Sequence, residues 1–207
     1  RKILLIPDRW YPSDRSLVDD PKFFLAKNGR SNPKDELMAT LEGLFSPAEK
    51  SEDAVRCHYA ARAAWLVERL AIPSHEMPEQ ACPERDKFID FLQYQSASLV
   101  FSNYYVDNPA SMFGHSFLRL HRRPEDRNDQ ALLDDITNYA AFITEENKDW
   151  LYPIKGLTGA FIGRFSLLPY YRKIQEYNNY ESRDLWEYEL KLTAAQLRRL
   201  EQMLWEL

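Results

Sequence analysis

The chain has 207 residues, with 27 Lys and Arg against 32 Asp and Glu, which gives a net charge of −5. This length allows one domain, or one domain with an extension, and an aromatic content of 14% is too high for a disordered chain. The basic residues are scattered along a mildly acidic sequence, so nucleic-acid binding is not expected. No apolar run approaches the roughly 20 residues that a membrane span requires, so no transmembrane segment is expected.

The first helix is expected between Asn32 and about Phe45. Asn32 can accept hydrogen bonds from the first helical amides, and Pro33 suits the first helical position. Acidic residues follow in the first turn, where they favour the helix dipole. The apolar stripe of this helix is formed by Leu37, Leu41 and Leu44.

Residues 54–70 and 84–94 are expected to form a helical hairpin, joined by a connection that contains several prolines. Cys57 and Cys82 bracket this connection and are the two cysteines of the chain. They do not have the C-x-x-C spacing of a zinc or redox site. Two readings remain open on spacing alone: a disulfide in an oxidising compartment, or two buried thiols in a reducing one.

After Ser96 the composition becomes β-branched and aromatic, and apolar and polar residues alternate. The runs read as strands are residues 97–106, 115–121, 135–143 and 185–192, with a loop at 108–114, a glycine-rich segment at 156–165 and a helix at 170–180. The sequence therefore predicts an α+β fold, in which a helical N-terminal region of residues 1–95 is packed on a small antiparallel sheet in residues 96–207.

The last helix is expected to begin after Thr193, because Thr193 and Gln196 have the spacing of a capping box. Leucines then recur at helical spacing up to Leu207, and no Gly, Asn or Pro ends the pattern. We expect that the chain continues beyond Leu207 in a longer protein. The alternative is a natural C-terminal helix.

His115 is the first candidate for chemistry, because it follows Gly114 directly at the start of a predicted strand. An imidazole held there by a rigid sheet can serve as a general base. Asn138 lies in the next predicted strand and could accept a hydrogen bond from the ring, which would fix its tautomer. The alternatives are a histidine that caps its strand and an asparagine that satisfies its own backbone.

The other polar residues give weaker indications of a catalytic or metal-binding site. His121 is expected at the end of its strand, in a solvated turn beside two arginines, and Ser111 does not lie in the G-x-S-x-G pattern of a serine hydrolase. Asp134 and Asp135 are adjacent in a strand, so they should point to opposite faces and form no acid–base pair. The histidine spacings predict no metal site, and no motif predicts a cofactor.

Four segments together resemble the Lnb-type N-terminal periplasmic domain family of Gram-negative cell envelopes. They are NPASMFGHSFLRL, DITNYAAFI, GLTGAFIGRFSLLPYY and YNNYESRDLWEYELKLTAAQLRRLEQMLWEL, and the resemblance covers residues 97–207. The segments SLVDDPKFFLAKNGRSNPKDELMATL and CHYAARAAWL are similar to the N-terminal extension of proteobacterial members. The family is related in pattern to papain-like thiol amidases and acyltransferases.

The resemblance implies a papain-like core, cut short on its C-terminal side, with His115 as the base and Asn138 as the residue that orients it. The family's cysteine nucleophile belongs to a motif downstream of the last helix, and neither Cys57 nor Cys82 matches it. The implied protein is an envelope thiol hydrolase or acyltransferase whose cysteine lies beyond Leu207. The fragment alone would be inactive, and the alternative is a non-catalytic periplasmic binding or scaffolding module.

The resemblance also implies a place and a partner. The place is the periplasm, or the outer membrane facing it, and the partner is an envelope substrate such as a lipoprotein, a lipid or a peptidoglycan component. Because the periplasm is oxidising, the resemblance favours a disulfide between Cys57 and Cys82.

Overall fold

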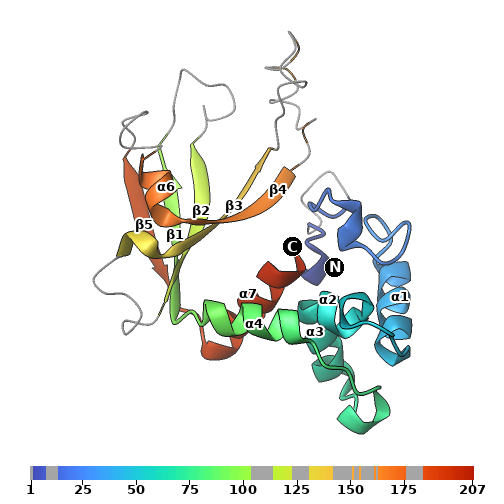
Figure 1. Ribbon diagram of the computed structural model, residues 1–207. Coiled ribbons are helices and arrows are strands. Elements are labelled where there is room, and N and C mark those ends of the chain that lie inside the picture. The colour runs from blue at the N-terminus through green and yellow to red at the C-terminus, as the bar shows by residue number, and fades with distance from the viewer. Residues whose placement is uncertain are drawn as a thin grey trace. The chain divides into compact units, whose positions relative to one another are not determined.

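The computed structural model describes residues 2–7, 14–103, 114–122, 131–141, 163–175 and 184–207, together with residues 151, 154 and 161. The chain divides into two compact units, one of residues 1–92 and 198–207 and one of residues 93–197. The first is built mainly from helices and the second around a sheet, so the fold is α+β, as predicted (Figure 1). The division into domains at residues 95 and 96 stays a prediction.

The helices of the first unit pack around a core of Leu44, Ala63 and Leu66. The first helix begins as predicted, because the Asn32 side chain accepts hydrogen bonds from the amides of the first turn. The predicted helix of residues 54–70 is interrupted at Tyr59, which leaves helical geometry and separates two helices. The helices of this unit are α1 (Pro33–Phe45), α2 (Val55–His58), α3 (Ala60–Leu70) and α4 (Pro83–Leu92), with short 3-10 turns at Lys2–Leu4, Pro21–Phe23, Ser51–Asp53 and Ser74–Glu76.

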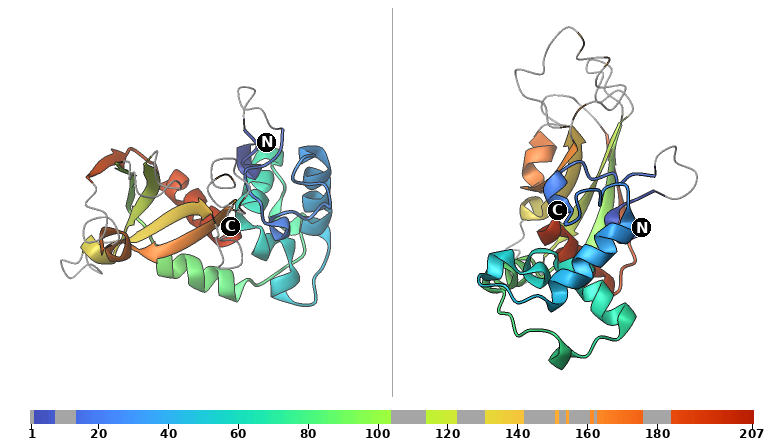
Figure 2. Two further views of the ribbon diagram at one scale, coloured as in Figure 1. Left: turned by 90° about the horizontal axis from the view of Figure 1, so that it is seen from above. Right: turned by 90° about the vertical axis from the view of Figure 1, so that its right-hand side faces the viewer.

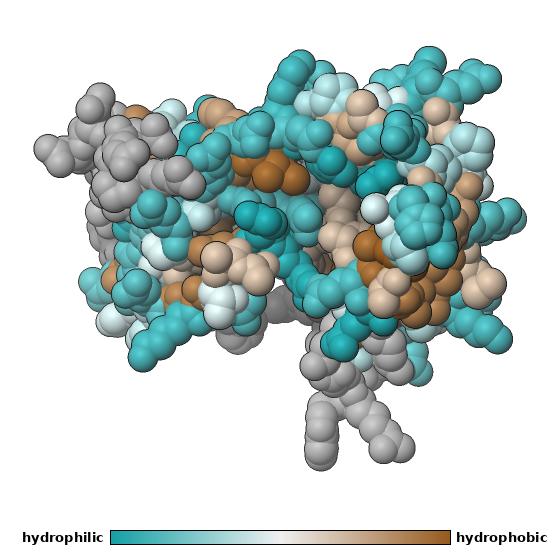
Figure 3. Space-filling model, turned by 90° about the horizontal axis from the view of Figure 1, so that it is seen from below, coloured by the Kyte–Doolittle hydropathy of each residue, from teal (hydrophilic) through white to brown (hydrophobic). Residues whose placement is uncertain are grey.

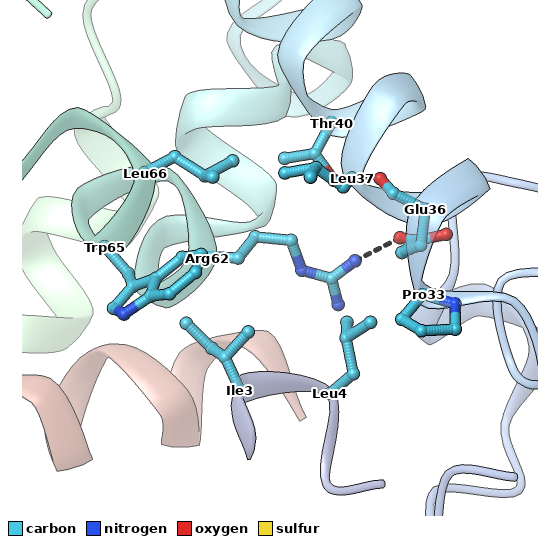
Figure 4. A pocket seen from close by; sticks show the side chains of 9 residues that line it. All are labelled: Ile3, Leu4, Pro33, Glu36, Leu37, Thr40, Arg62, Trp65 and Leu66. Carbon is cyan, nitrogen blue, oxygen red and sulfur yellow. Dashed lines mark hydrogen bonds and ion pairs between the residues drawn. The ribbon is translucent and has the colours of Figure 1, made fainter. Parts of the chain in front are cut away.

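A buried arginine lies at the centre of this unit. Arg62 on α3 is only 2% exposed, and its guanidinium forms ion pairs with Glu36 and Glu206. The guanidinium also donates to the carbonyl of Phe23 at 2.7 Å and lies over the rings of Phe23 and Tyr59. Figure 4 shows Arg62 and Glu36 facing each other among the apolar side chains of a small pocket. A charge buried this deeply is tolerated because acceptors surround it.

The last helix of the chain, α7 (Ala194–Glu206), begins with the predicted capping box. The Thr193 amide donates to the Gln196 side chain at 2.8 Å, and the Gln196 amide donates to the Thr193 hydroxyl at 3.3 Å. At its other end, Glu206 accepts from the backbone amides of Ala61 and Arg62 at 3.0 and 3.2 Å. These amides belong to the first turn of α3, which has no side-chain cap from its own N-cap residue.

The strands described in the second unit form one antiparallel sheet in the order β4-β3-β2-β1-β5. Their bounds are β1 (Ser96–Ser102), β2 (His115–His121), β3 (Asp135–Ala141), β4 (Gly163–Pro169) and β5 (Leu185–Leu190). A 3-10 turn at Ala131–Leu133 precedes β3. Strand β4 is not predicted by the sequence, because its residues do not alternate cleanly between apolar and polar and glycines dominate the preceding segment.

One face of the sheet carries the core of this unit. Val100, Phe117 and Ile136 point to this face from the three central strands. They contact Tyr170, the first residue of the short helix α6 (Tyr170–Ile174), which lies against the sheet (Figures 1 and 2). The rest of the predicted helix of residues 170–180 lies outside the described residues.

Cys57 and Cys82 form a disulfide, with their Cα atoms 5.2 Å apart. This confirms the pairing that the resemblance favours and excludes the reading of two reduced thiols. The bridge joins the short helix α2 to the start of α4 and is packed against Ala54. Both cysteines of the sequence are therefore used.

In the part of the chain that the structure describes, no helix is long and apolar enough to cross a membrane. On the face drawn in Figure 3, hydrophobic residues form separate groups among hydrophilic ones. The predicted loop at 108–113, with Ser111, and most of the glycine-rich segment lie outside the described residues.

Candidate functional site

The backbone before β2 fixes the position of His115. Gly114 has a φ of +81°, and a Cβ atom at this position would lie 2.6 Å from the carbonyl oxygen of Ser102. Only glycine meets both demands without strain. His115 then pairs with Ser102 in the β1–β2 ladder, and the Ser102 hydroxyl donates to the His115 carbonyl at 3.3 Å. The backbone of His115, the first residue of β2, is thus fixed by Gly114 and by pairing with β1.

Asn138 on β3 reaches the same side of the sheet. The ladder pairs Leu118 with Thr137, so Asn138 is a diagonal neighbour of His115 on one face. The structure brings the two together, since His115 Nε2 is hydrogen-bonded to Asn138 Oδ1. Asn138 is buried, whereas His115 is partly exposed.

This hydrogen bond fixes the chemistry of the ring. An amide oxygen can only accept, so Nε2 is the nitrogen that donates, and Nδ1 is then the basic nitrogen of the neutral ring. The ring of Phe117, with its centroid 6.4 Å away, lies along the same face. A partly exposed imidazole with one tautomer selected can accept a proton from a nucleophile at Nδ1.

The chain itself offers no thiol for this base. Its two cysteines are both in the disulfide, and a disulfide sulfur is not a thiolate nucleophile. A thiol partner for His115 would therefore have to come from outside these 207 residues.

His121 ends its strand as predicted, but the prediction that it is solvated is wrong. His121 is the last residue of β2, and its side chain is only 13% exposed. Its Nδ1 lies 2.8 Å from a carboxylate oxygen of Asp134, and its Nε2 lies 2.8 Å from the hydroxyl of Ser98. The alternation of β2 directs His121 to the same face as His115, where strands β1 and β3 enclose it.

Arg119 completes this second polar cluster. Its Nε donates to Asp134 at 3.0 Å, and its Nη1 donates to Glu187 on β5 at 2.8 Å. Asp135 instead accepts from Tyr94 at 2.7 Å and from Arg122. The two aspartates thus have different partners, although only Asp135 lies in β3 and Asp134 directly precedes it. Ser98 and Arg119 were not among the predicted site residues, although the alternation of HSFLRLH places Arg119 and His121 on the face of His115.

Among the residues with described positions, no group of three or more His, Cys, Asp and Glu side chains could hold a metal ion.

Two protein-family models match parts of the chain. Residues 84–207 match the family described as the Lnb N-terminal periplasmic domain, and residues 1–69 match a domain of unknown function, DUF7843. No curated protein and no solved structure matches the chain. The description of the first family indicates a periplasmic location. Because its match spans more than half of the 207 residues and contains both His115 and Asn138, the chain belongs to the Lnb N-terminal periplasmic domain family.

Proposed function

We propose that this protein is part of a periplasmic thiol hydrolase or acyltransferase that acts on an amide or an ester. His115 is the general base, Asn138 orients it, and the nucleophile is a cysteine outside these 207 residues. The observation that carries the proposal is the hydrogen bond between His115 Nε2 and Asn138 Oδ1, because it leaves Nδ1 as the basic nitrogen. A buried amide that holds one tautomer of a partly exposed histidine suits proton transfer better than it suits a strand cap.

The proposed reaction has two stages. Nδ1 of His115 takes the thiol proton, the thiolate attacks the substrate carbonyl, and the imidazolium returns the proton to the leaving amine or alcohol. The acyl-thioester then passes its acyl group to water in a hydrolase or to an amine in an acyltransferase. The substrate class is an envelope component, such as a lipoprotein, a lipid or a peptidoglycan fragment, in the periplasm or at the outer membrane.

The decisive experiment measures alkylation of the downstream cysteine in the longer protein. An ordinary thiol has a pKa of about 8.5 and reacts slowly with iodoacetamide at pH 6 to 7, whereas a thiol beside an imidazole ionises more readily. His115→Ala should slow alkylation in this pH range while the protein stays folded. His75→Ala, at an exposed histidine of the first unit, is the matched control.

Two outcomes would contradict the proposal. One is an alkylation rate that His115→Ala leaves unchanged, and the other is amide or ester turnover by the 207-residue chain that depends on His115. The second outcome would show that His115 needs no cysteine from elsewhere.

A non-catalytic binding module is the second candidate, and the opposite face of the sheet favours it. Trp186 and Tyr188 on β5 are 43% and 59% exposed, and Trp186 is stacked on Phe101 of β1 with ring centroids 6.0 Å apart. Exposed aromatic rings are common in binding surfaces. A longer protein that lacks a downstream cysteine would favour this candidate.

A further inference from the structure

We propose that Ser98, His121 and Asp134 form a second site, in which Ser98 is a nucleophile toward small carboxylic esters. This site lies on the same sheet face as His115, but six residues further along β2, which corresponds to about 20 Å at the rise of a strand. It is independent of the proposed thiol chemistry, because it requires neither His115 nor a cysteine.

The hydrogen bonds of the three side chains have the pattern of a serine nucleophile and its base. A carboxylate can only accept, so His121 Nδ1 is the nitrogen that donates to Asp134, at 2.8 Å. In the neutral ring, His121 Nε2 is then the acceptor for the Ser98 hydroxyl, also at 2.8 Å, and a carboxylate oxygen of Glu187 lies 3.5 Å from the same nitrogen. A serine–histidine–aspartate group is recognised by these roles and not by the order of its residues in the sequence.

The surroundings hold the base in place. The Asp134 side chain is 1% exposed, and it also accepts from Arg119 at 3.0 Å, which compensates its buried charge. Ser98 and His121 are fixed by the β1–β2 ladder, which pairs Ser98 with Arg119 and Ser96 with His121. The strands β1 and β2 therefore position Ser98 and His121, and Asp134 lies directly before β3, which favours preorganised chemistry.

A cavity of about 350 Å³ opens onto this group and is lined by Ser96, Ser98, His121, Glu187 and Glu189. Ser98 lines this open cavity with only 3% of its surface exposed, so the electrophile must be small or narrow. The two glutamates on the wall disfavour an anionic substrate, and an uncharged or cationic ester fits the charge of the cavity. Arg119, which donates to Glu187, brings a guanidinium close to this wall.

The chemical step balances without a cofactor. The Ser98 Oγ–H proton passes to His121 Nε2 as the Oγ–carbon bond forms at the ester carbonyl. The ester C–O bond then breaks, and the alcohol leaves with the proton from His121. Water, activated in turn by His121, cleaves the acyl-serine, releases the carboxylic acid and restores Ser98.

The experiment treats the folded chain with a small fluorophosphonate and locates the modified residue by peptide mass spectrometry. Ser98 should be modified in the folded protein and not in urea, where the three side chains are no longer together. His121→Gln should slow the modification by at least about 100-fold, because the general base is lost. Ser116→Ala is the matched control, since Ser116 is an exposed serine of β2 that points to the other face.

A purely structural cluster predicts a different result. Ser98→Ala and His121→Gln would then lower the melting temperature, and the folded wild-type protein would not be modified at Ser98. The absence of labelling at Ser98, equal labelling in urea, or a rate unchanged in His121→Gln would each overturn the proposal. The wild-type measurement alone is sufficient if a variant does not fold.

Discussion

Asn138 selects one of two tautomers of His115, because its amide oxygen accepts from Nε2. We expect Asn138→Ala to lower His115-dependent alkylation of the downstream cysteine by about 10- to 100-fold, as is typical when a supporting partner is lost. The measurement is the alkylation rate at pH 6 to 7 in the longer protein. Asn138→Gln is the informative companion, since it keeps the amide but moves its oxygen. An effect of Asn138→Ala on stability alone would show that the amide does not orient the base.

Gly114 provides a prediction about stability. Gly114→Ala must place a side chain at a φ of +81° and at 2.6 Å from the Ser102 carbonyl oxygen. We expect a loss of about 1–3 kcal/mol in the free energy of unfolding, measured by urea denaturation. Ser116→Ala, on the exposed side of the same strand, should change it by less than about 0.5 kcal/mol. Equal effects of the two changes would show that the entry to β2 tolerates a Cβ atom.

At the scale of the elements, the contact between α7 and α3 gives a prediction about pH. Burial raises the pKa of Glu206, and the nearby Arg62 guanidinium and the amides of α3 only partly oppose this. A carboxyl group whose pKa is raised in the folded state binds its proton more tightly there than in the unfolded chain. The contribution of the Glu206 carboxyl to the free energy of unfolding is therefore complete below its pKa in the unfolded chain, about 4.3. It is lost as the pH rises through the higher pKa of the folded state.

Glu206→Gln tests this sign, because the amide keeps the shape and does not titrate. The difference in unfolding free energy between the wild-type protein and Glu206→Gln should shift in favour of the variant as the pH rises above about 4. Urea denaturation at several pH values measures it. A difference that is constant with pH, or that changes in favour of the wild-type protein, would contradict the raised pKa.

The elements differ in how far the sequence predicts them. The starts of α1 and α7 follow from Asn32 and Thr193, because a helix cap is a contact between residues three or fewer positions apart. The pairing of His115 with Asn138 follows from strand alternation in two neighbouring runs. Strand β4 was missed, because its place in the sheet depends on pairing with β3 and not on its own pattern.

The Ser98–His121–Asp134 group could not be predicted for a related reason. It requires the register between β1 and β2, and a shift of one residue would direct Ser98 to the other face. The buried contact of Arg62 with Glu206 joins positions 144 residues apart. Arg62 and Glu206 are charged residues on helices, where such residues are usually exposed, so the local sequence gives no sign that they are buried.

For the whole molecule, the disulfide is the testable covalent feature. Cys57 and Cys82 are 25 positions apart and enclose the proline-containing connection between α3 and α4. We expect the double change Cys57→Ser and Cys82→Ser to lower the free energy of unfolding by about 3 kcal/mol, mainly because the unfolded chain gains freedom. Denaturation curves of the oxidised, reduced and doubly substituted proteins measure it. An unchanged midpoint in reductant would show that the bridge adds nothing to stability.

The cap that Glu206 provides for α3 has a consequence for the order of events during synthesis and export. The residues matched by DUF7843 emerge before residue 206, yet the first turn of α3 and the Arg62 guanidinium gain one of their acceptors only when residue 206 follows. If residues 1–92 closed into a core before that, the Arg62 cation would be buried with one partner missing, which is costly. Completion of the first unit therefore requires residues 198–207, which are synthesised only after all of residues 93–197, so the second unit can form before the first is complete.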